Sequence, residues 1–201
     1  MSWLRRVTIK STNRESAFKL TELLHDPIDL TKHLPFRVAV VSNLLALNRD
    51  WKIREVCDLE PREMRVLLNI GSYMPIKSAD IAYQSRMDSY TVSRAVKKLL
   101  ALGLIETQPD AHKKNVKNLV LNQAGTVLYR QLSQALDNRA HDLEDIFSAQ
   151  ELDLFYNLLE RIENKTEQFL AEQARGLIDN GAEPPADQKE LIRWAKKTTK
   201  G

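Results

Sequence analysis

The sequence has a single cysteine and no long apolar run. Cys57 alone excludes an internal disulfide, which is consistent with a reducing compartment. No apolar stretch approaches the roughly 20 residues that span a bilayer, and the basic N-terminus is not followed by the apolar segment of a secretory signal. These absences predict a cytoplasmic protein with no membrane partner.

The sequence also lacks the motifs of common enzymes. We find no Gly-rich cofactor loop, Walker loop, nucleophile elbow or pair of catalytic carboxylates. The four histidines do not fall at metal-ligand spacings: His25, His33, His112 and His141. We therefore predict no enzyme, no cofactor and no metal site. What the chain does have is 201 residues, 43% of them hydrophobic, enough for one medium domain with a good core.

Residues 77–121 have the pattern of two short helices followed by a β-hairpin. Ser78 is a candidate cap for the first helix and Asp88 for the second, which should end at Gly103. Strands are expected over 104–108 and 116–121, because the apolar period there falls to about two. The second helix has a core stripe at helical spacing: Val92, Val96 and Leu99.

The face of the second helix opposite this stripe carries side chains that can reach DNA. A turn of about 100° per residue places Tyr90, Arg94 and Lys97 there. Long donors on such a face suit a recognition helix in the major groove, and a lysine-bearing hairpin loop suits a wing against the backbone. The candidate DNA contacts are Ser78, Arg86, Ser89, Tyr90, Thr91, Ser93, Arg94, Lys97, Lys98, His112, Lys113, Lys114 and Lys117.

Two runs carry a resemblance to a known family. The segments IAYQSRMDSYTVSRAVKKLLALGLI and PDAHKKNVKNLVLNQAG are similar to the DNA-binding core of the MarR family of bacterial transcription regulators. The similarity extends over about residues 30–173. It implies a mainly α fold: a winged helix-turn-helix core with a small β-hairpin wing and long dimerisation helices. It departs from the family in the wing, where Lys113, Lys114 and Asn115 follow Asp110.

The patterns on either side of this core predict the remaining segments of the chain. We predict an N-terminal extension over 1–30 with a short helix at 15–25, a MarR-like domain over 31–175 with its DNA-binding lobe at about 58–122, and a flexible tail over 176–201 with Trp194 exposed. Helices are expected over 34–49 and 61–70. A long helix capped by Asn122 should be followed by another that begins at Ser148 and runs to about 173.

Charge is unevenly distributed along the chain. Residues 77–117 hold eight basic and four acidic residues, whereas residues 137–172 hold ten acidic and three basic residues. A basic reading head with an acidic far end suits binding to a polyanion. The long apolar helices suggest a second copy of the chain, so a homodimer would read an inverted-repeat operator in double-stranded DNA.

The resemblance further implies a small, often aromatic, anionic effector that releases a repressor from its operator. Candidate effector contacts are His33, Phe36, Arg37, Trp51, Arg65, Tyr73 and Met74. Each has an alternative role as a surface ion pair or a core residue. Two further alternatives stay open: Cys57 as an oxidation sensor, and a winged-helix module that binds a protein rather than DNA.

Overall fold

The computed structural model describes residues 18–109 and 117–198. The chain divides after Arg49 into two compact units. Within the described residues, no helix has the length and apolar character of a membrane span. The first unit contains α2 (Leu34–Leu44) and a 3-10 turn (Leu47–Arg49). The second contains α3 (Trp51–Val56), α4 (Pro61–Tyr73), α5 (Ser78–Ser85), α6 (Ser89–Ala101), β1 (Ile105–Pro109), β2 (Lys117–Leu121), α7 (Gln123–Glu144), α8 (Ala149–Asp179) and α9 (Ala186–Thr198).

The first unit differs from the sequence prediction at two places. No helix forms over the described residues 18–25, where Thr21 accepts a hydrogen bond from the Leu23 N–H in a local turn that competes with a helix. The helix expected over 34–49 stops at Leu44. A 3-10 turn follows at Leu47–Arg49, and Asp50 caps a separate helix, α3, by accepting from the N–H groups of Lys52 and Ile53.

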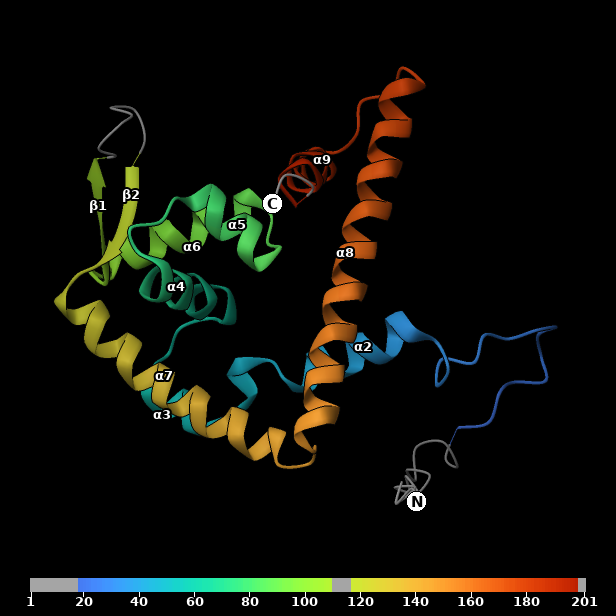
Figure 1. Ribbon diagram of the computed structural model, residues 1–201, viewed down its shortest axis with the longest axis horizontal. Helices are drawn as coiled ribbons and strands as arrows, with labels where there is room; N and C mark the ends of the chain where they lie inside the picture. Colours follow the sequence, from blue (N-terminus) through green and yellow to red (C-terminus); the bar gives the residue numbers. More distant parts are fainter. Residues whose placement is uncertain (1–17, 110–116, 199–201) are drawn as a thin grey trace. The chain divides into compact units, whose positions relative to one another are not determined.

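Helices α4, α5 and α6 together with β1 and β2 form one lobe, residues 61–121, which corresponds to the DNA-binding lobe predicted at about 58–122. Strands β1 and β2 pair antiparallel (Figure 1), and Ile105 lies opposite Leu121 in the register of the pair. Ile76, between α4 and α5, also pairs with Leu119 of β2, which fixes the hairpin to the helices. The core of the lobe consists of Met64, Val66, Leu67, Ile70, Ile81, Val92, Leu99, Ile105 and Leu119.

The predicted helix boundaries in the lobe are largely confirmed. Asp88 caps α6, and Gly103 takes the left-handed conformation just after its end, at φ 63°. Ser78, by contrast, is the first helical residue of α5, and Lys77 occupies the capping position. Helix α4 also runs past Gly71, whose α-carbon lies against the ring of Tyr129 on α7.

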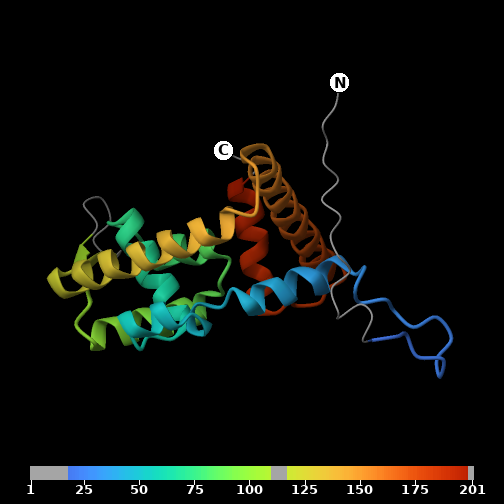
Figure 2. The ribbon, with the colours of Figure 1, turned by 90° about the horizontal axis from the view of Figure 1, so that it is seen from below.

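The long helices begin where the sequence predicts. Asn122 accepts from the Gly125 N–H at the start of α7, and Ser148 forms a reciprocal capping box with Glu151 at the start of α8. The prediction for the C-terminal part of the chain was wrong at two places. Helix α8 continues to Asp179 and does not end near residue 173, and residues 186–198 form α9 instead of a flexible tail. Figures 1 and 2 both show α9 beside the upper part of α8.

Candidate nucleic-acid interface

Helix α6 is held by a tight cap at its N-terminus. The Asp88 carboxylate accepts from the backbone N–H of Thr91 at 2.8 Å and from its hydroxyl at 2.7 Å. These hydrogen bonds, the side-chain one first, lower the pKa of Asp88 below its ordinary value. The half-buried Thr91 is therefore committed to the cap, and the cap fixes the direction in which the helix leaves the turn.

The buried face of α6 is the one that the periodicity predicts. Val92 and Leu99 are fully buried and Val96 nearly so, together with Ala95. Burial of this face anchors α6 on α4 and leaves the opposite face at the surface. That face presents Ser89, Tyr90, Ser93, Arg94, Lys97 and Lys98, all exposed.

Tyr90 and Arg94 are arranged as a pair on the exposed face. The Tyr90 side chain is 71% exposed, and the Arg94 guanidinium carbon lies 5.7 Å from the centre of its ring. A cation over an aromatic face is attracted to it, which favours side-chain conformations of Arg94 that lie near the Tyr90 ring. The surface therefore combines positive charge with a partly ordered donor, as contact with phosphates and guanine edges requires.

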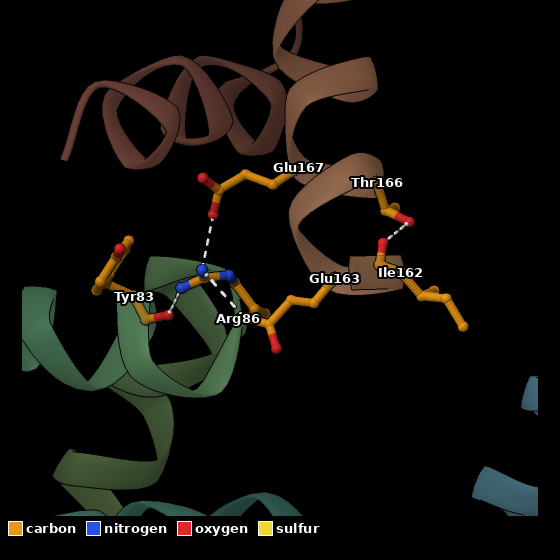
Figure 3. Close-up of polar contacts among 6 residues, drawn as sticks. All are labelled: Tyr83, Arg86, Ile162, Glu163, Thr166 and Glu167. Carbon is orange, nitrogen blue, oxygen red and sulfur yellow. Dashed lines mark hydrogen bonds and ion pairs between the residues drawn. The ribbon is translucent and has the colours of Figure 1, made fainter. Parts of the chain in front are cut away.

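The structure places Arg86 differently from the other candidates. This residue ends α5 with a left-handed backbone, and its side chain is only 25% exposed. Figure 3 shows its guanidinium directed at α8, where Nη2 lies 2.8 Å from Glu167 and 3.1 Å from Glu163. Its other nitrogen Nη1 donates to the Tyr83 carbonyl. Arg86 thus links the lobe to α8 in this conformation.

The remaining DNA-contact candidates lie at the edges of the lobe. Ser78 is half-buried at the start of α5, and Lys117 is exposed at the start of β2. The three loop candidates fall outside the described residues: His112, Lys113 and Lys114. Their contribution to a wing therefore stays a prediction.

The effector candidates occupy two units and have local partners. His33 accepts from the Phe36 N–H as the cap of α2, and Trp51 donates to Glu55 on α3. Met74 accepts from the Leu121 N–H at 3.4 Å through its sulfur. The other candidates are exposed: Arg37, Arg65 and Tyr73. A hollow at the start of α7 is lined by other residues, Asn122 and Leu128 among them.

Cys57 lies in the connection before α4 and is half-buried. Burial raises the pKa of its thiol, and the neighbouring charge of Asp58 acts in the same direction. A raised pKa lowers the fraction of reactive thiolate, so this environment disfavours a redox role. Within the described residues, no three metal-ligating side chains gather into a cluster.

Sequence reasoning missed the contacts that α9 makes with the lobe. Glu190 accepts from the Ser89 N–H, Trp194 packs on Tyr83, and Lys197 pairs with Asp80. Trp194, predicted to be exposed, is half-buried. A tryptophan within a short amphipathic segment was the one signal in the sequence, but its partner is 111 residues away along the chain.

This arrangement of a capped, outward-facing helix beside an antiparallel hairpin is that of a winged helix-turn-helix fold. The sequence model of the MarR family matches residues 58–114. No curated protein matches the chain by sequence. Among solved structures, a MarR/EmrR family transcriptional regulator from Acinetobacter sp. ADP1 is 25% identical with a TM-score of 0.64, covering 70% of this chain and 99% of its own.

Two further solved structures share the fold. MepR from S. aureus, solved as a DNA complex, is 20% identical with a TM-score of 0.58 and covers 65% of this chain and 96% of its own. CouR from Rhodococcus jostii RHA1, bound to p-coumaroyl-CoA, is 14% identical with a TM-score of 0.60 and covers 68% and 95%. Residues 58–114 thus match the MarR family, and the fold of the chain is that of MarR family regulators.

Proposed function

We propose that the chain is a homodimeric repressor that binds an inverted-repeat operator and is released by a small effector. The observation that carries the proposal is the outward face of α6, where Tyr90, Arg94 and Lys97 are exposed beside a buried core stripe. Arg94 would bind a base edge or a phosphate, and Lys97 and Lys98 would neutralise the backbone. The loop between β1 and β2 would lie against the backbone as a wing.

A dimer is supported by the apolar surface that α8 leaves uncovered. Large apolar side chains of this helix remain 39–58% exposed: Leu154, Phe155, Tyr156, Leu158, Leu159 and Phe169. Patches of this kind mark interaction sites, because exposing contiguous apolar area to water is unfavourable. A second copy would bury it and present two recognition helices about 34 Å apart, one turn of DNA.

An effector is supported by a ligand bound to a solved structure of similar fold. CouR, which shares the fold, was solved with p-coumaroyl-CoA, an aromatic acyl thioester. In this chain the exposed arginines Arg37 and Arg65 can bind an anionic group, and the exposed rings of Trp51 and Tyr73 can pack on an aromatic one. We propose a small aromatic acid as the effector class.

The DNA-binding proposal is tested with a fluorescent duplex that covers the region next to the protein's own gene. Arg94→Ala should weaken binding by about 1 to 3 kcal/mol if the arginine contacts a base in a bidentate manner. The matched control is Arg175→Ala, an equal loss of charge on the exposed surface of α8. Binding should also fall by orders of magnitude between about 50 and 200 mM salt.

Several outcomes would contradict the proposal. Equal DNA binding by Arg94→Ala and Arg175→Ala would exclude the exposed face of α6 as the reading surface. No salt-dependent binding to any duplex would favour the alternative of a protein-interaction module. A monomer in analytical ultracentrifugation would exclude the dimer, and the absence of a thermal shift with aromatic carboxylates would leave the effector class without support.

A further inference from the structure

Helix α9 contacts the DNA-binding lobe along a single face. Its three contact residues, Glu190, Trp194 and Lys197, are spaced by four and then three positions, which places them on one side of a helix. The Trp194 ring meets the ring of Tyr83 edge-on at 6.5 Å, and Lys197 lies 2.8 Å from Asp80. Three separate interactions thus dock α9 on α5 and on the start of α6.

The contact of Glu190 is made with the end of the recognition helix. Its carboxylate is only 8% exposed, and its oxygens lie 3.1 and 3.3 Å from the backbone nitrogen of Ser89. Ser89 is the first residue of α6, and Asp88 already accepts from the Thr91 N–H. Glu190 therefore takes one of the unpaired donors at the positive end of the helix.

The backbone N–H of Ser89 is a donor of the kind that binds DNA phosphates. Backbone N–H groups at helix N-termini bind phosphate oxygens, and a recognition helix enters the major groove with its N-terminal residues leading. A carboxylate at hydrogen-bond distance from the Ser89 N–H is an anion in the position that a phosphate would take. With α9 docked, the leading end of α6 is covered by protein.

A second candidate DNA contact is held in the same way. Arg86 is paired with Glu163 and Glu167 of α8, and Glu167 is only 5% exposed. Figure 3 shows these carboxylates on the α8 side of the guanidinium. Acidic groups from α8 and α9 thus occupy a backbone donor and a side-chain cation, while Arg94 and Lys97 on the outward face stay exposed.

We propose that α9 is an autoinhibitory helix that competes with DNA for the N-terminal end of the recognition helix. The inference rests on the proposed DNA-binding function of α6. Residues 180–185 connect α9 to α8, against which α9 also packs, and the released state is the one in which its contacts with Tyr83, Ser89 and Asp80 are broken. The docked and released states then bind DNA with different affinities, and the apparent affinity is reduced by the fraction of released protein.

The test compares two substitutions in the full chain, Glu190→Gln and Asp187→Asn. Both remove one negative charge from α9, but Asp187 is exposed in the first turn of the helix, whereas Glu190 is buried against Ser89. The net charge of α9 therefore changes equally in the two variants, although Glu190 also lies 3.9 Å from Arg193. We expect Glu190→Gln to bind a labelled duplex about tenfold more tightly than Asp187→Asn, because the docked state loses a charge-assisted hydrogen bond.

Equal affinities of these two variants would overturn the inference. Weaker binding by Glu190→Gln would overturn it too, since α9 would then assist DNA binding. Circular dichroism and thermal unfolding establish that both variants are folded. Trp194→Ala removes the ring contact with Tyr83 without changing charge, and it should also tighten binding relative to wild type.

A second measurement uses the unmodified chain. On addition of duplex DNA, amide hydrogen exchange should become faster over residues 186–198 and slower over α6, because α9 leaves as DNA binds. Unchanged protection of α9 in the DNA complex would overturn the inference. If wild type and the α9 variants all fail to bind any duplex, the proposed function itself fails; equal binding by all of them sinks only the autoinhibition.

Discussion

Helix α8 and the lobe formed by residues 61–121 differ in how far their apolar side chains are buried. In the lobe, α4 and α6 bury Met64, Leu67, Val92 and Leu99 almost completely within one chain. In α8 the buried residues are Glu167, Ala171 and Ala174, while most of its large apolar side chains remain exposed. The lobe thus has a complete core of its own, and α8 needs a further apolar surface to cover it.

This difference explains how each region can serve DNA binding. A reading surface must be rigid, and the lobe obtains rigidity from a closed core and from caps such as Asp88. The exposed apolar residues of α8 would suit the proposed dimer, because a dimerisation helix must present an apolar surface to a partner. Four predictions test the comparison, taken from the largest expected effect to the smallest.

The largest effect is expected from Leu99→Ala in the core of α6. Leu99 is fully buried, so the substitution leaves a cavity and should lower the free energy of unfolding by about 2 to 5 kcal/mol. Leu154→Ala on α8, where the side chain is 58% exposed, is the matched control. Its effect should appear only as weaker dimerisation, visible as a stronger dependence of the melting temperature on protein concentration. If urea unfolding gave Leu99→Ala and Leu154→Ala equal losses in the free energy of unfolding of a single chain, the comparison would be contradicted.

The next effect comes from two glycine substitutions with opposite signs. A Cβ on Gly125 would lie 1.9 Å from the backbone oxygen of Leu104, where α7 leaves the hairpin. Gly125→Ala should therefore destabilise the protein by about 1 to 3 kcal/mol. Gly176→Ala, inside α8 with no atom near its Cβ, should stabilise by about 0.5 to 1 kcal/mol. Urea unfolding of both variants would show whether the two regions differ in packing as proposed.

A smaller effect is expected from Asp88→Ala at the cap of α6. Loss of the two hydrogen bonds to Thr91 should cost about 1 kcal/mol, whereas Asp88→Asn keeps an acceptor and should cost less. The pKa of Asp88 is lowered in the folded state. Its contribution is therefore present above the ordinary carboxyl range and is lost as the pH falls through the lowered pKa. A wild-type advantage over Asp88→Ala that persists in strong acid would contradict this assignment.

The sequence predicts the lobe well because its determinants are local. The spacing of Val92, Val96 and Leu99 fixes which face of α6 is buried, and with it the exposure of Tyr90 and Arg94. The caps at Asp88, Asn122 and Ser148 each involve residues within three positions, so they are visible in the sequence. Fold class and reading face follow from such short-range patterns.

The contacts missed from the sequence all depend on distant partners. Arg86 has the positive charge expected of a DNA contact. Its ion pairs, however, are with residues of α8 about 80 positions further along the chain. Helix α9 follows a Gly- and Pro-containing connection that resembles a flexible tail, and only its packing on Tyr83 and Ser89 orders it. Tertiary packing determines whether such segments are ordered, and short-range periodicity in the sequence does not indicate it.

The smallest effect concerns Cys57, which lies between α3 and the lobe. Burial raises the pKa of its thiol, so near neutral pH less of it is thiolate than in the unfolded chain. A thiol reagent should therefore label the native protein more slowly than the same protein in urea, and the native rate should rise with pH as thiolate forms. Rapid labelling of the native protein at neutral pH would reopen the redox role. Slow labelling would be consistent with Cys57 serving as a small, partly buried apolar group in the connection before α4.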